Sequence, residues 1–164
     1  KDFPLSIPLL SPERFPKLTK CVGLLTYGLT LEDDLYKFAY SLLLGSLFLL
    51  RRFSDLITRY GVSVHEVRIG GGVTQSEFIL RLLANVLKVP ILRPKELIEA
   101  GLVGNTIFTL KALGYHNSLK KAYESLSLKY EEFSPNHDEV EVIEELYKRF
   151  AFLLNKYIEL CGSG

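Results

Sequence analysis

Three consecutive glycines, Gly70, Gly71 and Gly72, are the residues whose type and spacing most directly suggest chemistry in this sequence. Glycine allows a positive φ and has no Cβ to obstruct an approaching group. A helix that begins after such a turn presents unpaired N–H groups and the positive end of its dipole. The turn is therefore a candidate seat for a phosphate or the polar edge of a nucleotide. The spacing leaves open a tight strand-to-helix turn without a ligand.

Other motifs of catalysis and metal binding are absent from the sequence. The glycines do not lead into the Gly-Lys-Ser/Thr of a Walker loop, and they lack the Gly-x-Gly-x-x-Gly spacing of a Rossmann turn. His65, His116 and His137 lie in different segments without neighbours at metal-ligand spacing, so we expect no metal site in this chain. There is no Gly-x-Ser-x-Gly elbow, and we assign no catalytic residue to the chain.

Length and composition indicate one globular domain over residues 1–164, with 48% hydrophobic residues available for a core. The net charge of +1 predicts neither a nucleic acid nor an anionic membrane as partner. The apolar run from Phe38 to Leu50 is too short to span a bilayer. We expect a cytoplasmic protein without a signal peptide, in which Cys21 and Cys161 fit a reducing compartment better than a disulfide framework. Methionine is absent, which suggests a trimmed fragment.

The elements around the glycines alternate between strand and helix. A strand over residues 64–69 precedes them, a helix from Ser76 to Lys88 follows, and a short strand comes at residues 89–92. This alternation predicts parallel strands joined by a helical crossover.

The flanking segments predict further helices. A strand from Val22 to Leu29 leads to Thr30, a candidate N-cap for a long helix that ends near Tyr60, with Gly61 at its C′ position. Prolines recur near the start and predict extended loop there: Pro4, Pro8, Pro12 and Pro16. Beyond the central strands, the sequence predicts a helix whose Gly101 and Gly104 permit close approach to a neighbouring helix or to a ligand. It also predicts a short helix capped by Ser118, a turn at residues 133–136 and a final helix from about Asp138.

The segment from Ile69 to His116 resembles a characteristic region of the FGGY carbohydrate kinases. The matching features are the glycine turn, the helix end at Ala84-Asn85, the strand at Pro90-Ile91, Glu99-Ala100, and Gly104-Asn105. The opening is also similar to a family loop, through Pro8, Ser11, Glu13, Arg14 and Pro16. The resemblance covers nearly the whole chain and preserves the order of the motifs.

The resemblance implies an α/β fold of the ribonuclease H-like, actin-like ATPase type, a helix-rich domain with a mixed sheet flanked by helices. The chain would be the C-terminal, nucleotide-side domain of a two-domain kinase that uses ATP and Mg²⁺ to phosphorylate a sugar or polyol, a pentulose such as xylulose in the first instance. The implied nucleotide-binding residues are Gly70, Gly71, Gly72, Val73, Gln75 and Ser76. The catalytic base and most metal ligands would lie in an N-terminal kinase domain, so this fragment alone would be inactive.

Departures from the family pattern favour a second hypothesis, a non-catalytic actin-like module that binds a nucleotide or a protein. Asn85 stands where Asp is usual, Gly45 or Leu44 where Glu is common, and Pro12 where Gly is. A third hypothesis is a Rossmann-type dinucleotide domain, for which Glu96 and Glu99 are only loosely placed. An isolated domain should also expose an apolar surface that could drive self-association, for example as a homodimer.

Overall fold

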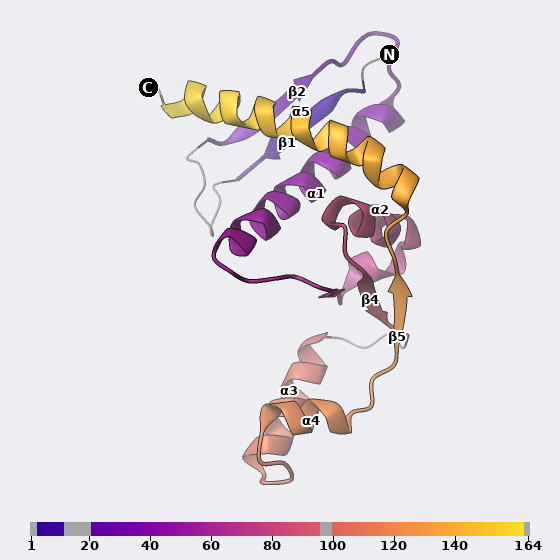
Figure 1. Cartoon of the computed structure of the whole chain (residues 1–164), viewed down its shortest axis with the longest axis vertical. Coiled ribbons are helices and arrows are strands. Elements are labelled where there is room, and N and C mark those ends of the chain that lie inside the picture. Colours follow the sequence, from indigo (N-terminus) through magenta and orange to yellow (C-terminus); the bar gives the residue numbers. More distant parts are fainter. Residues whose placement is uncertain (1–2, 12–20, 96–99, 163–164) are drawn as a thin grey trace. The chain divides into compact units, whose positions relative to one another are not determined.

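The computed structural model describes residues 3–11, 21–95 and 100–162, and Figure 1 traces them along the chain. The chain divides into two compact units. The first unit combines residues 1–63 with residues 137–164, and the second is formed by the intervening residues 64–136. Each unit has a sheet of its own.

The described residues of the first unit form two strands and two long helices. Strand β1 (Leu5–Leu9) pairs antiparallel with β2 (Gly23–Tyr27). Helices α1 (Leu35–Arg59) and α5 (His137–Gly162) both contact β1. Because residues of a strand alternate between its two faces, Leu5, Ile7 and Leu9 lie on one face of β1, and Ser6 lies on the other, where it meets α1. Buried apolar side chains of this unit include Leu5, Ile7, Leu9, Leu44, Phe48, Phe150 and Leu154.

Helix α1 approaches β1 most closely at Gly45. A Cβ at this position would lie 2.0 Å from the carbonyl oxygen of Ser6, so only glycine fits without movement of the backbone. The buried hydroxyls of Ser6 and Ser41 complete the contact with a hydrogen bond of 2.7 Å. Gly45 therefore has a packing function in this chain, which accounts for the absence of a longer side chain.

The start of α1 differs from the predicted cap at Thr30. The N-cap is Asp34, whose Oδ1 accepts a hydrogen bond of 2.8 Å from the backbone N–H of Lys37. Thr30 instead belongs to a preceding turn, where its N–H and hydroxyl donate to Asp33 Oδ2. The prediction was wrong because Asp34 lies nearer to the free amides and is an equally good capping residue. At the other end, Gly61 has a φ of +85°, as its predicted C′ position requires.

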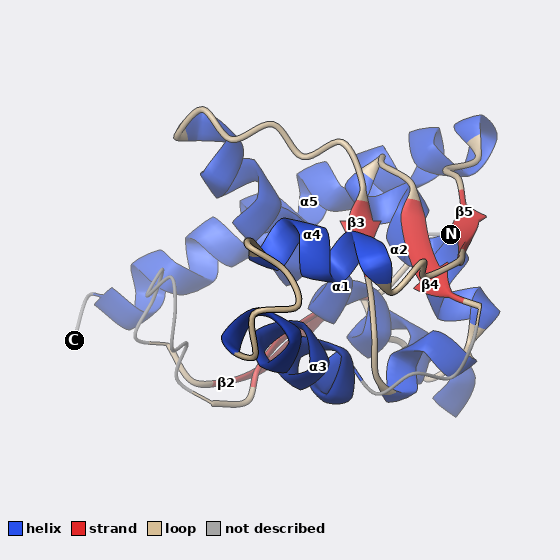
Figure 2. Cartoon of the chain, turned by 90° about the horizontal axis from the view of Figure 1, so that it is seen from below, coloured by secondary structure: helices blue, strands red, loops and turns tan. Residues whose placement is uncertain are grey.

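The second unit contains a three-stranded mixed sheet in the order β3-β4-β5, shown in red in Figure 2. Its strands are β3 (Val67–Arg68), β4 (Ile91–Pro94) and β5 (Tyr130–Phe133). β3 and β4 are parallel, which confirms the predicted crossover, whereas β5 pairs antiparallel with β4. The sequence did not reveal β5 because its two central glutamates break the apolar pattern typical of a strand.

The described α-helices of the second unit follow the sequence prediction closely, whereas its 3-10 helix was not predicted. The described helices are the 3-10 helix η1 (Gly72–Gln75) and the α-helices α2 (Glu77–Leu87), α3 (Ala100–Ala112) and α4 (Leu119–Ser125). Ser76 caps α2 and Ser118 caps α4, as predicted. The described residues place no neighbouring helix close to Gly101 or Gly104, because a Cβ at either position would meet nothing within 4 Å, and close approach to a ligand there stays a prediction.

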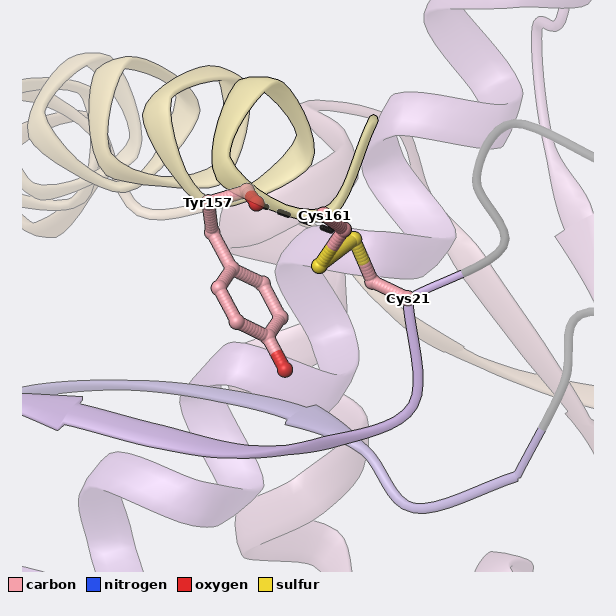
Figure 3. Close-up of a disulfide and its surroundings, with 3 residues drawn as sticks. All are labelled: Cys21, Tyr157 and Cys161. Carbon is pink, nitrogen blue, oxygen red and sulfur yellow. Dashed lines mark hydrogen bonds between the residues drawn. A yellow bond between two sulfur atoms is a disulfide. The ribbon is translucent and has the colours of Figure 1, made fainter. Parts of the chain in front are cut away.

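A disulfide joins Cys21 and Cys161, so the prediction of unpaired cysteines is wrong (Figure 3). The two residues are 140 positions apart, and the packing of α5 brings their Cα atoms to 5.7 Å. Tyr157, one turn before Cys161, lies against the start of β2, where a Cβ on Gly23 would be 2.9 Å from its hydroxyl oxygen. Sequence spacing could not show this pairing, because it depends on how the two ends of the first unit pack together.

Apolar side chains remain exposed in both units. On α3, Leu102 and Phe108 are each 64% exposed. These exposed side chains agree with the apolar surface expected from the sequence. That a partner domain covers this surface in the full-length protein stays a prediction. Among the described residues, no helix is both long enough and apolar enough to cross a membrane.

Candidate functional site: the glycine turn before helix α2

The glycine turn connects β3 to η1 and is open to solvent. Gly71 has a φ of +86°, a conformation that other residues adopt at a cost. A Cβ at Gly71 or Gly72 would meet nothing within 4 Å. The backbone of the turn is therefore accessible to a ligand, and Gly72 is not required by any neighbouring atom of the described protein.

A short 3-10 helix separates the turn from α2, which the sequence did not predict. Within it, Thr74 N donates to Gly71 O at 3.1 Å, and the buried Thr74 hydroxyl donates to the same oxygen at 2.7 Å. Such a turn fixes the path of the chain through the glycines. The amides at its start have no partner within the helix and are the groups that an anion would engage.

The remaining predicted site residues follow on this turn. Val73 and Gln75 are exposed, and Ser76 is partly exposed. Ser76 Oγ accepts a hydrogen bond of 3.4 Å from Ile79 N, so its hydroxyl oxygen already has a function as the N-cap of α2. The six predicted nucleotide residues thus lie together on one accessible segment.

Arg93 supports the turn from the neighbouring strand β4, and sequence reasoning did not find it. Its Nη1 donates to the carbonyl oxygen of Thr74 at 3.0 Å. Its Nε donates to Glu131 Oε2 at 3.1 Å, and its guanidinium lies 5.0 Å from the ring centre of Phe133. The hydrogen bond with Glu131 is the main reason that the pKa of Arg93 lies above its usual value. These contacts join β4 to β5 and to the glycine turn, which are distant in sequence. No local sequence pattern could therefore have indicated them.

A hollow of about 140 Å³ lies beside Gly70, bordered by Arg68, Val103 and Tyr130 among others. Arg68 Nη1 donates to the hydroxyl of Tyr123 at 2.6 Å, and the hydroxyls of Tyr123 and Tyr130 lie 2.8 Å apart. Partial burial, followed by this hydrogen bond, raises the pKa of Tyr130 to about 12. Tyr130 therefore stays protonated at neutral pH, and the two hydrogen-bonded hydroxyls form a polar wall next to the turn.

Several predicted features cannot be placed. The Glu13-Arg14 pair and its prolines, Glu96 and Glu99 lie outside the described residues. Among the described residues, no three His, Cys, Asp or Glu side chains are grouped as metal ligands. The open glycine turn fits a phosphate group, whereas the described residues offer no cluster for Mg²⁺.

Comparison with known proteins gives a consistent result. The model of the C-terminal domain of the FGGY family of carbohydrate kinases matches residues 2–113. A glycerol kinase from Mycoplasmoides gallisepticum is 35% identical over 82 residues, which are 50% of this chain and 16% of that protein.

Solved structures show the same likeness. A ligand-bound xylulose kinase from Lactobacillus acidophilus superposes with a TM-score of 0.84 at 22% identity, covering 98% of this chain and 32% of the other. A Plasmodium falciparum glycerol kinase with ADP gives a TM-score of 0.67 at 20% identity, covering 96% and 30%. The predicted fold class, the actin-like ATPase type, is thereby confirmed. The chain spans only a minor part of each of these proteins.

Proposed function

Because this chain belongs to the FGGY family of carbohydrate kinases and matches its C-terminal domain, we propose that it is the nucleotide-side domain of an ATP-dependent sugar kinase. Its two compact units would act as one domain. The observation that supports this proposal most directly is the open, braced glycine turn at the position where the family resemblance expects the nucleotide. A solved xylulose kinase among the similar structures supports a pentulose such as xylulose as the substrate.

The turn would bind ATP through its backbone. Gly70, Gly71 and Gly72 would let phosphate oxygens approach the free amides at the start of η1, with Val73, Gln75 and Ser76 at the nucleoside side. ATP supplies the phosphoryl group when it is bound. The part played by this chain is to position and orient it, which is most of what phosphoryl transfer requires.

The remaining machinery would come from an N-terminal kinase domain. That domain would supply the catalytic base, most ligands of Mg²⁺ and most sugar contacts, and would cover part of the exposed apolar surface. The fragment alone would then bind nucleotide weakly and catalyse nothing. Association of two copies through the same apolar surface is the corresponding proposal for the isolated domain.

Gly72→Val in the full-length protein tests the nucleotide site. A Cβ at this position meets nothing within 4 Å, and the branched side chain of valine would obstruct a ligand above the turn, so we expect an unchanged melting temperature and at least about tenfold weaker ATP binding. Gly104→Ala on α3 is the matched control, because its Cβ is equally unhindered and it lies outside the turn. Equal ATP affinity in Gly72→Val and the wild type would exclude the turn as the site.

The second hypothesis, a non-catalytic actin-like module, rested on Asn85 and Gly45. Both residues have packing roles in the structure, because Gly45 permits the contact with Ser6 and Asn85 Oδ1 accepts a hydrogen bond of 2.7 Å from Asn136 N. The kinase is therefore the better-supported function. Sugar-dependent release of ADP by the full-length protein, tested with xylulose, other pentuloses, hexuloses and glycerol, distinguishes the two, since the non-catalytic module would release none.

A further inference from the structure

A second hollow, of about 280 Å³, lies within the first unit between α1 and α5. We call it the α1–α5 hollow and define it by Arg52, Asp55, Leu56, Arg59, Tyr147 and Asn155. It belongs to a different unit from the glycine turn, so its chemistry is independent of the proposed nucleotide site. Its volume is just below the range of about 300–1,000 Å³ usual for small-molecule pockets.

Helix α1 contributes two cationic side chains, Arg52 and Arg59, and the carboxylate of Asp55 to the hollow. Arg52 and Arg59 are seven residues apart, about two helical turns, so both side chains can reach the same hollow. Arg59 forms no ion pair with any other described residue. Arg52 Nη1 donates to Asn155 Oδ1 at 3.2 Å, which orients the amide and leaves its NH₂ group available as a donor.

Tyr147 borders the hollow from helix α5 and is fixed by its neighbours. Its hydroxyl donates to Asp55 Oδ2 at 2.5 Å, and partial burial together with this hydrogen bond raises the pKa of Tyr147. The guanidinium of Arg51 lies over the Tyr147 ring, 3.9 Å from its centre, and pairs with Glu144. Tyr147 therefore has a fixed position, and Asp55 keeps one carboxylate oxygen free of that hydrogen bond.

The groups in the hollow together favour a ligand that carries both a phosphate and hydroxyl groups. Guanidinium groups match phosphate oxygens in charge and in their forked geometry. A carboxylate oxygen beside an amide NH₂ accepts from and donates to hydroxyl groups. The side chain of Leu56 and the ring of Tyr147 supply apolar surface between these polar groups.

We propose that the α1–α5 hollow binds a phosphate monoester carried on a small hydroxylated molecule, with Arg52 and Arg59 on the phosphate and Asp55 and Asn155 on the hydroxyls. Nothing in this arrangement requires the nucleotide turn. The ligand would bind to free protein and to nucleotide-bound protein alike.

Calorimetric titration of the full-length protein with ribose 5-phosphate, ribose and inorganic phosphate tests the proposal. We expect binding of ribose 5-phosphate, weaker binding of phosphate alone, no measurable binding of ribose, and no competition from ATP. In Arg59→Gln the affinity for ribose 5-phosphate should fall at least about tenfold, because a charged hydrogen-bonding group is lost from an exposed position that the fold does not need.

Lys156→Gln is the matched control. It removes the same charge from the same unit next to Asn155, but Lys156 does not border the hollow and pairs with Glu159. Absence of ribose 5-phosphate binding, equal affinity in Arg59→Gln, an equal loss in Lys156→Gln, or displacement by ATP would each overturn the proposal. Equal affinity for phosphate and ribose 5-phosphate would overturn the part assigned to Asp55 and Asn155. ATP binding by the glycine turn is measured separately, so failure here leaves the proposed function untouched.

Discussion

Single hydrogen bonds hold the glycine turn in position, and the bond from Arg93 to Thr74 O comes from the neighbouring strand. Arg93→Ala should leave the fold intact but loosen the turn, so we expect ATP affinity to fall on the order of three- to tenfold. Titration of the full-length variant with ATP measures this loss. Arg93→Lys, which keeps the charge but loses the forked contact with Glu131, should recover only part of the affinity.

Arg81→Ala is the matched control for this prediction. Arg81 also pairs with Glu77 and stacks near Phe133, but it makes no bond to the turn. If Arg81→Ala weakened ATP binding as much as Arg93→Ala, the effect would come from the general charge of this surface and not from the hydrogen bond between Arg93 and Thr74 O.

Asn85 shows how a departure from a family pattern can keep its physical function. Its side chain is 2% exposed, and Oδ1 accepts from Asn136 N. Asn85→Leu would remove the buried acceptor of this hydrogen bond, and we expect a loss of about 1–3 kcal/mol in the free energy of unfolding. Asn85→Asp keeps the acceptor and should lose less. Urea unfolding of the two variants checks the order, and an equal loss would show that the acceptor is unimportant.

At the scale of elements, the contact between α1 and β1 depends on the lack of a side chain at one position. Gly45→Ala would place a Cβ 2.0 Å from the Ser6 carbonyl oxygen, so we expect destabilisation of about 1–3 kcal/mol or more in urea unfolding. Gly101→Ala on α3 is the control, because its Cβ would be unhindered and alanine favours a helix. Equal stability of Gly45→Ala and wild type would mean that α1 can move away from β1 without cost.

The elements that could be predicted from sequence are those that local chemistry determines. Ser76 and Ser118 begin helices because a side-chain oxygen caps amides three residues away. β5 and the disulfide escaped prediction because both depend on residues distant in sequence. The pairing of Glu131 with Arg93 on β4 stabilises a strand whose own pattern is too short and too charged.

The candidate site divides in the same way. The glycine turn was visible because positive φ and close approach both call for glycine, so residue type and spacing were enough. Arg93, Thr74 and the tyrosines beside Gly70 were not visible, because their roles arise from contacts between strands and turns. The sequence therefore located where a ligand could approach but not what holds that segment in place.

At the scale of the whole molecule, the disulfide is the strongest constraint on the first unit. It closes a loop with a sequence separation of 140 residues, for which loop-closure entropy gives a stabilisation of up to about 5 kcal/mol. Reduction should lower the urea midpoint of the first unit and leave the second unit unchanged. Residue-resolved hydrogen exchange with and without a dithiol reductant measures the stability of each unit separately.

One variant makes this test independent of the reductant. Cys161→Ser should match the reduced wild type and should not respond to dithiol. A wild-type protein whose exchange rates are the same in both redox states would show that α5 is held without the disulfide.

The discontinuous chain of the first unit has a consequence for its biosynthesis. Residues 64–136 leave the ribosome before α5 exists, so the second unit can fold while the first still lacks its last helix. Until α5 arrives, one side of the β1–β2 pair has no cover, and the thiol of Cys21 has no partner. Completion of the first unit therefore waits for the synthesis of α5, and premature termination after residue 136 would leave a folded second unit attached to an unfinished first.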